Sequence, residues 1–181
     1  SQVGGSFARN GGDAGLDYFN GRMYNLNGAV AGSSLYIINM ATGAPTLVGS
    51  SATCADSRAI DEVGNAFAVG GLSGSNNLYS VDLTNGAMAL VGPLGSNFNA
   101  QVGLSFGPDG TLWLINSAGE IYSVNTATGA ATLRANVTVG GAATGSWEGL
   151  AIDQTSALNR MSIPAFVSTF SNAALSRGYY F

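Results

Sequence analysis

The residues with catalytic potential in this chain are few, and their types exclude the commonest enzyme mechanisms. The 181-residue sequence contains no histidine, and all six of its basic residues are arginines. Nucleophilic triads that depend on histidine therefore cannot form, and neither can a histidine-ligated metal site. A phosphate-binding loop of the Gly-x-x-x-x-Gly-Lys type is excluded as well, because the chain has no lysine.

Carboxylates are the remaining groups that could perform acid–base chemistry or hold a metal ion. The candidates are Asp56, Asp61, Glu62, Glu148 and Asp153. Two of them at a suitable separation would be needed for a glycosidase-type mechanism. However, the chain has only ten acidic residues, many at expected turns, and it lacks the Asp-x-Asp-x-Asp spacing of a calcium loop. We therefore predict that the protein is not an enzyme and has no cofactor and no metal site.

Charge is scarce over the whole chain and slightly negative. Charged residues make up 9% of the sequence, and the formal net charge is −4, whereas about 25% of the residues in an ordinary soluble domain are charged. Because no basic patch is available to neutralise phosphates, we expect no nucleic-acid partner. The apolar runs, such as 112–115, have the length of strands, so we expect no transmembrane segment.

A repeat of 43 residues organises most of the sequence. Tyr36, Tyr79 and Tyr122 are separated by two steps of 43, and each lies in an alternating apolar and polar stretch followed by a glycine-containing turn. Alternation with a period of two predicts a strand, and glycine supplies the positive φ that a tight hairpin needs. A second apolar stretch follows each turn, at 45–49, 88–92 and 131–133. Each unit is therefore predicted to contain a hairpin.

A second hairpin precedes the first one in each unit. It is clearest at 103–115, where the turn Pro108-Asp109-Gly110 separates two apolar stretches. Equivalent stretches begin near Gly15, Ala59 and Gly149, so the chain contains four unit starts. Two hairpins in about 45 residues have the size of one β-propeller blade.

The predicted fold class is all-β, a small β-propeller-like domain of four units with four antiparallel strands each. The units span approximately 15–56, 57–102, 103–148 and 149–181, and the last is completed by 1–14. The fourth unit lacks its final Leu-Val-Gly strand, whereas Val3-Gly4 at the other end of the chain matches Val48-Gly49. We therefore expect the N-terminal strand to complete the last unit, either within one chain or between chains.

The stretch 103–116, Gly-Leu-Ser-Phe-Gly-Pro-Asp-Gly-Thr-Leu-Trp-Leu-Ile-Asn, together with 120–129, Glu-Ile-Tyr-Ser-Val-Asn-Thr-Ala-Thr-Gly, resembles the repeat of secreted bacterial β-propeller proteins. The resemblance covers units two and three well, unit one fairly and unit four poorly. It implies a propeller fold but no particular substrate, because the matching residues are turn glycines and core apolar residues.

Ligands of propellers usually bind where the loops between units gather on one face. The residues of these loops that we predict to bind a ligand are Asp56, Arg58, Phe98, Asn99, Trp147 and Glu148. Aromatic rings there could stack on a sugar or a peptide. For Trp147 we favour the alternative, that its ring packs between units and that Trp147→Ala harms folding more than binding. The lone Cys54 is expected to be a small buried hydrophobic residue.

Three further expectations concern the tyrosines, the termini and the location. Tyr36, Tyr79 and Tyr122 are expected to be structurally equivalent and substantially buried between units. The residues assigned to assembly or ring closure are Val3, Phe7, Tyr179, Tyr180 and Phe181. The chain begins at Ser1 without a methionine, as a mature secreted protein does, so we expect an extracellular or cell-surface location.

Low charge favours a surface that is occupied by neighbours, because soluble proteins normally avoid association through interspersed charge. We therefore expect a non-enzymatic extracellular structural or self-assembling protein that associates with itself or with another extracellular protein. The alternative is a monomeric secreted module that binds a glycan or a protein on its loop face. The state of association of the native protein separates the two.

Overall fold

The computed structural model describes residues 12–29, 31–55, 57–70, 76–96, 98, 102–139, 142–143 and 149–152. Within these residues the chain forms three four-stranded antiparallel sheets in which sequential strands are neighbours. Blade 1 comprises β1 (Gly12–Phe19), β2 (Arg22–Ala29), β3 (Gly32–Ile38) and β4 (Pro45–Ser51). Blade 2 comprises β5 (Ser57–Ile60), β6 (Ala66–Gly70), β7 (Asn77–Val81) and β8 (Met88–Pro93). Blade 3 comprises β9 (Val102–Phe106), β10 (Leu112–Asn116), β11 (Glu120–Val124) and β12 (Ala131–Asn136).

The turns within each blade are closed by short polar side chains. In the β7–β8 turn the Asp82 carboxylate accepts hydrogen bonds from the backbone and hydroxyl of Thr84, at 2.8 and 2.7 Å, and from the Asn85 amide at 2.8 Å. Asn39 and Asn125 accept backbone hydrogen bonds in the same way in the equivalent turns of blades 1 and 3. These side chains replace backbone partners that the turn leaves unpaired, so they terminate the strands at fixed positions.

The repeat seen in the sequence is reproduced in the strand register. Tyr36, Tyr79 and Tyr122 occupy the same place in the third strand of their blades, and a β-bulge precedes each of them. Their predicted equivalence is confirmed, but the prediction of substantial burial holds only for Tyr122. The other two are half-buried. Tyr36 lies on the face of blade 1 that no other described blade covers.

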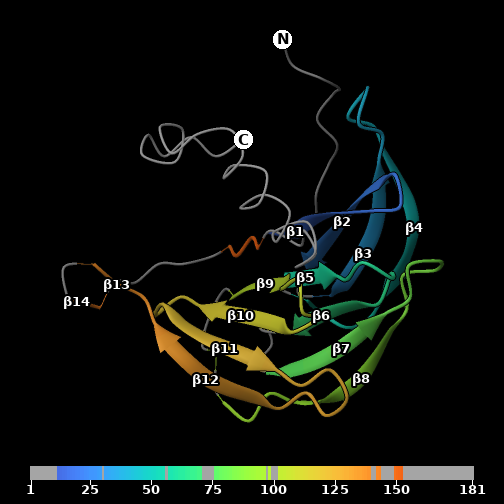
Figure 1. Cartoon of the computed structure of the whole chain (residues 1–181). Coiled ribbons are helices and arrows are strands. Elements are labelled where there is room, and N and C mark those ends of the chain that lie inside the picture. The colour runs from blue at the N-terminus through green and yellow to red at the C-terminus, as the bar shows by residue number, and fades with distance from the viewer. Residues whose placement is uncertain are drawn as a thin grey trace, which may run out of the picture.

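The blades are arranged as a fan around their first strands. Figure 1 shows β1, β5 and β9 side by side at the centre of the fan, with β4, β8 and β12 at its periphery, and β5 contacts both β1 and β9. The segment 149–152 continues this series, because the Ile152 backbone N–H donates to the Ser105 hydroxyl at 3.1 Å. Beyond these residues the fourth unit lies outside the described part of the chain.

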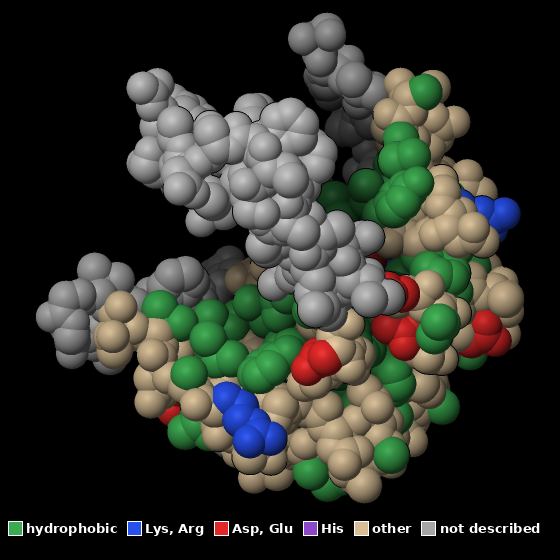
Figure 2. All heavy atoms as spheres, in the orientation of Figure 1, with side chains coloured by type: hydrophobic (Ala, Val, Ile, Leu, Met, Phe, Trp, Pro, Cys, Tyr) green, Lys and Arg blue, Asp and Glu red, His purple; other side chains and the backbone are tan. Residues whose placement is uncertain are grey.

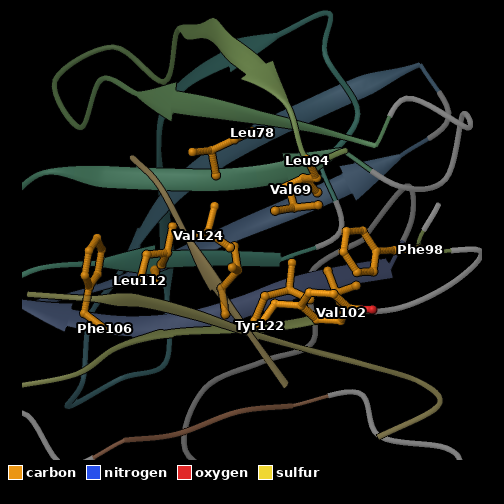
Figure 3. Close-up of a cluster of buried hydrophobic side chains, with 12 residues drawn as sticks. Val69, Leu78, Leu94, Phe98, Val102, Phe106, Leu112, Tyr122 and Val124 are labelled. Carbon is orange, nitrogen blue, oxygen red and sulfur yellow. The ribbon is translucent and has the colours of Figure 1, made fainter. Parts of the chain in front are cut away.

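Two hydrophobic clusters hold the blades together, one at each junction between them. The cluster between blades 2 and 3 includes Val69 and Leu78 from blade 2 and Leu112, Tyr122 and Val124 from blade 3, and Figure 3 shows these side chains converging. The cluster between blades 1 and 2 is centred on other residues, namely Tyr24, Leu26, Leu35, Ala55, Ile60, Ala66, Ala68 and Val81. Each blade therefore buries its apolar side chains mainly against its neighbours, as stacked repeat units do.

Glycine allows the outer parts of adjacent blades to approach closely. A Cβ atom on Gly49 of β4 would lie 1.7 Å from the backbone oxygen of Asn85, in the β7–β8 turn of blade 2. One on Gly92 of β8 would lie 2.2 Å from the backbone oxygen of Thr128, in the corresponding turn of blade 3. The glycine that ends each of these Leu-Val-Gly stretches thus allows the turn of the next blade to pack closely against it.

Two short strands follow blade 3, β13 (Thr138–Val139) and β14 (Ala142–Ala143), which the sequence repeat did not predict. They form a small antiparallel pair of their own. Among the residues that the structure describes, no helix has the length and hydrophobicity that a membrane span requires.

Candidate functional site

Of the residues predicted to bind a ligand, the structure describes Arg58 and Phe98, and both are buried, each with 3% of its surface exposed. They are separated by the β5–β8 sheet and do not form a common surface. The remaining predictions lie outside the described residues. These are Asp56, Asn99, Trp147 and Glu148, and the assembly residues Val3, Phe7, Tyr179, Tyr180 and Phe181.

Phe98 behaves as part of the core between blades 2 and 3. Its ring meets Tyr122 edge to face, with centroids 4.9 Å apart and planes at 89°. Its backbone N–H donates to the Asn76 side-chain oxygen at 3.0 Å, which holds the loop over the cluster. Both contacts belong to packing, so this ring does not offer a surface for stacking on a sugar.

Arg58 is a charged side chain at a position where the repeat otherwise has leucine. Leu16, Arg58 and Leu104 occupy the same position in the first strands of their blades. Each of them pairs with a residue of the second strand, and that residue pairs with the repeated tyrosine of the third strand. The Arg58 Nη2 atom donates to the Tyr24 carbonyl at 2.9 Å and to the Gly15 carbonyl at 3.5 Å. The guanidinium therefore ties β5 to the first two strands of blade 1.

The counterion of Arg58 is Asp17 of β1, whose Oδ2 atom lies 3.9 Å from Nη2. Burial raises the pKa of Asp17 to about 6, although the Arg58 charge opposes this, and burial lowers the pKa of Arg58 to about 10. Desolvation thus outweighs attraction for both groups. Three buried atoms of this pair have no hydrogen-bond partner, namely Asp17 Oδ2, Arg58 Nε and Arg58 Nη1. Among the described residues the same holds for Asn25 Oδ1 and Asn27 Oδ1, which lie on the other face of β2.

A groove of about 660 Å³ opens between blades 1 and 2, on the side of the molecule where the hairpin turns lie. Its lining includes Phe19 and Tyr24 of blade 1 and Phe67 and Leu83 of blade 2. Exposed Arg22 stands at its rim. The groove lies at the opposite end of the strands from the loops between units, where the sequence placed the ligand.

The groove exists because blade 2 carries small residues at the junction. Ala66 and Ala68 occupy the register positions that Leu112 and Leu114 occupy in blade 3. In blade 3 the leucines are completely buried and fill the junction. Alanine is smaller than leucine, and Ala66 lines the groove, whereas Ala68 is completely enclosed.

The exposed carboxylates of the turns have structural partners. The pKa of Asp82 is lowered by hydrogen bonds from Thr84 and Asn85, and that of Asp109 by hydrogen bonds from Thr111. Glu120 accepts a hydrogen bond from the Tyr122 hydroxyl at 2.8 Å, and this bond lowers the pKa of Glu120. In the described ranges, no group of three or more Asp, Glu, Cys or His side chains is placed to hold a metal ion.

One face of blade 1 differs from its equivalents in the other blades. Leu16 and Tyr18 are 62% and 61% exposed. The residues at the same two positions are Arg58 and Ile60 in blade 2 and Leu104 and Phe106 in blade 3. All four of these side chains are buried. In blades 2 and 3 this face packs against the preceding blade. We call the surface formed by Leu16, Tyr18, Met23 and Tyr36 the free face of blade 1.

The sequence contains a signal for the free face. Leu16 and Tyr18 align with core positions of later units, so their burial depends on a unit that precedes blade 1. The groove and the Arg58–Asp17 pair were signalled only weakly, by alanines and one arginine in places where the repeat has leucine. Spacing alone does not show which of these substitutions leaves a cavity.

The sequence matches no family model and no curated protein sequence. In structure the chain is similar to a protein of unknown function from Bacteroides thetaiotaomicron, with a TM-score of 0.54 and 16% identity over 77% of this chain and 35% of that one. It is also similar to the luciferin-regenerating enzyme, with a TM-score of 0.52 and 12% identity over 76% of this chain and 48% of that one. A third similar structure is hydrazine synthase from Kuenenia stuttgartiensis, with a TM-score of 0.50 and 15% identity over 74% of this chain and 38% of that one.

These proteins contain β-propellers, and the likeness shows that the three described sheets are arranged as propeller blades. At such low identity it concerns the fold alone. The chain spans less than half the length of each of the three structures.

Proposed function

We propose that this chain is a non-enzymatic extracellular protein that works by assembling with protein partners, and that the free face of blade 1 is its main contact surface. The observation that carries the proposal is the exposure of Leu16 and Tyr18 at positions that are buried in both other blades. An apolar surface built like an internal junction is suited to pack against another apolar β-sheet face.

The scarcity of charge supports the same proposal. Figure 2 shows a face on which acidic and basic side chains are few and uncharged groups cover most of the described surface. Charged residues are 9% of the sequence, so electrostatic repulsion offers little protection against association. The resemblance of the repeat to secreted bacterial propellers extends the proposal to a secreted protein.

Exposure of leucine alone does not make a contact surface in this protein. Leu47, Leu90 and Leu133 are exposed at equivalent positions of the outer strands in all three blades. Their exposure is therefore independent of whether a blade has a neighbour. Leu90, at 63% exposed, is a matched control for Leu16 at 62%.

The test is the mass of the native protein in solution, measured by light scattering over a concentration series. We expect the unmodified protein to associate, and we expect L16S/Y18S to remain folded but to associate at least about 30-fold more weakly, as loss of an aromatic anchor worth about 2 kcal/mol implies. L90S should associate like the unmodified protein. A protein that stays monomeric at all concentrations contradicts the proposal, and a loss of association in L90S alone assigns contact to the outer strands instead.

The groove between blades 1 and 2 supports a second candidate, a secreted module that binds a glycan or a protein segment. Its lining includes the half-buried side chains of Phe19 and Leu83 beside the exposed Arg22, and its volume of about 660 Å³ falls in the range of ordinary ligand sites. Glycan and peptide arrays probed with the unmodified protein and with R22S test this candidate. Equal array signals from both proteins, or no signal from either, count against it.

A further inference from the structure

The residues that the structure describes include three Asn-Gly steps, at 20–21, 27–28 and 85–86. This dipeptide is chemically labile, because glycine has no Cβ atom to keep its backbone nitrogen away from the preceding side-chain amide. Attack of that nitrogen on the amide releases ammonia. The reaction requires that the side chain can rotate, that neither group is held by a hydrogen bond, and that water can enter. The three steps share these two residues, so their surroundings in the fold distinguish them.

The step at 20–21 forms the β1–β2 turn. Phe19 pairs with Arg22, so Asn20 and Gly21 are the whole loop of a two-residue hairpin. Their φ angles are 47° and 78°, as a type I′ turn requires at both central positions, and Asn-Gly is the preferred dipeptide there. Among the described residues, Asn20 is the one residue other than glycine with a positive φ.

No contact restrains the two reacting groups of this turn. Asn20 and Gly21 are both exposed. Within the described residues, neither the Asn20 side chain nor the Gly21 backbone N–H forms a hydrogen bond. A Cβ atom on Gly21 would have no other atom within 4 Å, so the space around its nitrogen is open. The Asn20 amide is therefore free to rotate toward the nitrogen, and water has access to both.

The step at 85–86 is also at the surface, but its reacting groups are held. The Asn85 side-chain amide donates to Asp82 Oδ2 at 2.8 Å, and its oxygen accepts from the Ala87 backbone N–H at 2.8 Å. The Gly86 backbone N–H donates to the Asp82 carbonyl at 2.8 Å. Gly86 is buried and packs closely against Gly49. These bonds must break before the nitrogen can reach the amide.

The step at 27–28 is enclosed within β2. Asn27 is 7% exposed, and it pairs with Asp13 on one side and Ser34 on the other. A Cβ atom on Gly28 would overlap the Ala55 carbonyl oxygen, so the backbone here has no room to move. The backbone of a central strand is fixed by its two ladders, and water has little access to it. This step should therefore be the least reactive of the three.

We propose that Asn20 is a site of spontaneous deamidation, which makes the β1–β2 turn acidic. The Gly21 nitrogen bonds to the Asn20 side-chain amide carbon, and the bond from that carbon to the amide nitrogen breaks. The Gly21 N–H proton leaves with this nitrogen as ammonia, and a cyclic succinimide remains. Water then opens the ring to aspartate or isoaspartate. Because Asn20 is not part of the free face of blade 1, its reaction is independent of the proposed assembly.

The new carboxylate arises beside acidic residues of blade 2. Asn20, Asp61 and Glu62 line one cavity of about 580 Å³. The turns that carry them are in contact, because a Cβ atom on Gly64 would lie 2.7 Å from the Phe19 ring. Each deamidation adds a negative charge to a chain with a formal charge of −4, and like charges repel across this cavity. The modification is therefore expected to weaken the junction between blades 1 and 2.

Timed incubation of the unmodified protein at mildly alkaline pH, below its unfolding temperature, tests the site. Mass spectrometry of proteolytic peptides measures conversion at Asn20, Asn27 and Asn85. We expect Asn20 to convert at least about 10-fold faster than Asn85, since each hydrogen bond that must first break lowers the reactive population by roughly five-fold. The same protein in denaturant is the control, and there the three steps should convert at similar rates. Equal rates in the folded protein, or a difference that persists in denaturant, overturn the inference.

The effect on the junction is tested with Asn20→Asp, which imitates one product, alone and combined with Glu62→Gln. At low salt, Asn20→Asp should lower the melting temperature more in the presence of Glu62 than in its absence, and salt should reduce this difference. The comparison between the two backgrounds removes the preference of the turn itself for asparagine or aspartate. If Asn20 converts but the two changes are not coupled, the modification site stands and its effect on the junction is wrong.

Discussion

The junction between blades 1 and 2 and the junction between blades 2 and 3 are built from equivalent backbone positions but contain different side chains. At the second junction, Leu104, Leu112 and Leu114 of blade 3 fill the space against blade 2. At the first, the same positions hold Arg58, Ala66 and Ala68. One interface is a continuous apolar core, and the other contains a buried ion pair and a groove.

The comparison distinguishes the features of the repeat that set the backbone geometry from the side chains that differ between junctions. Both junctions share the strand register and the bulge before each tyrosine. They also share a glycine, Gly49 or Gly92, that the turn of the next blade contacts closely. Backbone geometry is therefore set by the shared turns and close approaches. Side-chain volume at three positions then decides whether a junction between the described blades is filled or contains a groove.

Removal of volume from the filled junction should produce the largest effect. Leu112 is completely buried, so Leu112→Ala should lower the free energy of unfolding by about 3 kcal/mol through lost burial and a new cavity. Chemical denaturation measures this change. Leu83→Ala, at a half-buried position lining the groove, should cost only about 1 kcal/mol. Equal losses in the two variants would contradict the difference between the junctions.

Replacement of the ion pair by the residues of the other units tests the first junction. The double change Asp17→Ala with Arg58→Leu should raise the free energy of unfolding by about 2 kcal/mol, because two desolvated charges are exchanged for apolar packing. Arg58→Leu alone should lower it by about 3 kcal/mol, since Asp17 then remains without its counterion. Thermal and denaturant unfolding at pH 7 provide the measurement. A double variant less stable than the unmodified protein would show that the pair stabilises the junction.

Acidification should affect the two junctions differently through Asp17. Its folded pKa of about 6 lies above the unfolded value of 3.8, so the folded state binds the proton more tightly. The contribution of Asp17 to stability is therefore gained as the pH falls from 7 through 6 and is lost as the pH rises again. Arg58, which faces it, stays charged over this range, because its pKa of about 10 lies well above 7.

The size of this pH effect is about 2 kcal/mol between pH 7 and pH 4, from a shift of about two pKa units. It is measured as the difference between the unfolding free energies of the unmodified protein and Asp17→Asn over that range. Subtraction removes the opposite contributions of Asp82, Asp109 and Glu120, whose pKa values are lowered in the folded state. A difference that does not change with pH would show that Asp17 keeps an ordinary pKa.

Filling the groove should have the smallest effect on stability. Ala66→Leu introduces the residue that blade 3 has at this position and should raise the free energy of unfolding by up to about 1 kcal/mol. Ala68→Leu is the control, because Ala68 is completely enclosed and a larger side chain there should cost about 2 kcal/mol through overpacking. Denaturant titrations of both variants measure the free energy of unfolding. If Ala66→Leu lowers this free energy as much as Ala68→Leu does, the groove has no room for a leucine side chain.

The fold was largely predictable from the sequence, whereas the candidate sites were not. The step of 43 residues from Tyr36 to Tyr122 and turns such as Pro108-Asp109-Gly110 predict four-stranded blades, and these are local features with a fixed period. Arg58 and Phe98 were predicted to bind a ligand because they lie in or next to the loops between units. Both are buried, since a segment near a loop face can still run through the junction between two blades.

The sequence by itself determined the strand pattern, the turns, the unit length and the absence of histidine and lysine chemistry. Each of these depends on residue type and on spacing within one unit, where local backbone preferences and the period of two act. Only the tertiary structure decided which leucines are buried and where a groove opens, because these depend on which unit lies against which. Leu16 and Leu104 have the same place in their units, and one is exposed while the other is buried. The physical reason is that burial is a property of a pair of surfaces, and the sequence of one unit specifies only one of them.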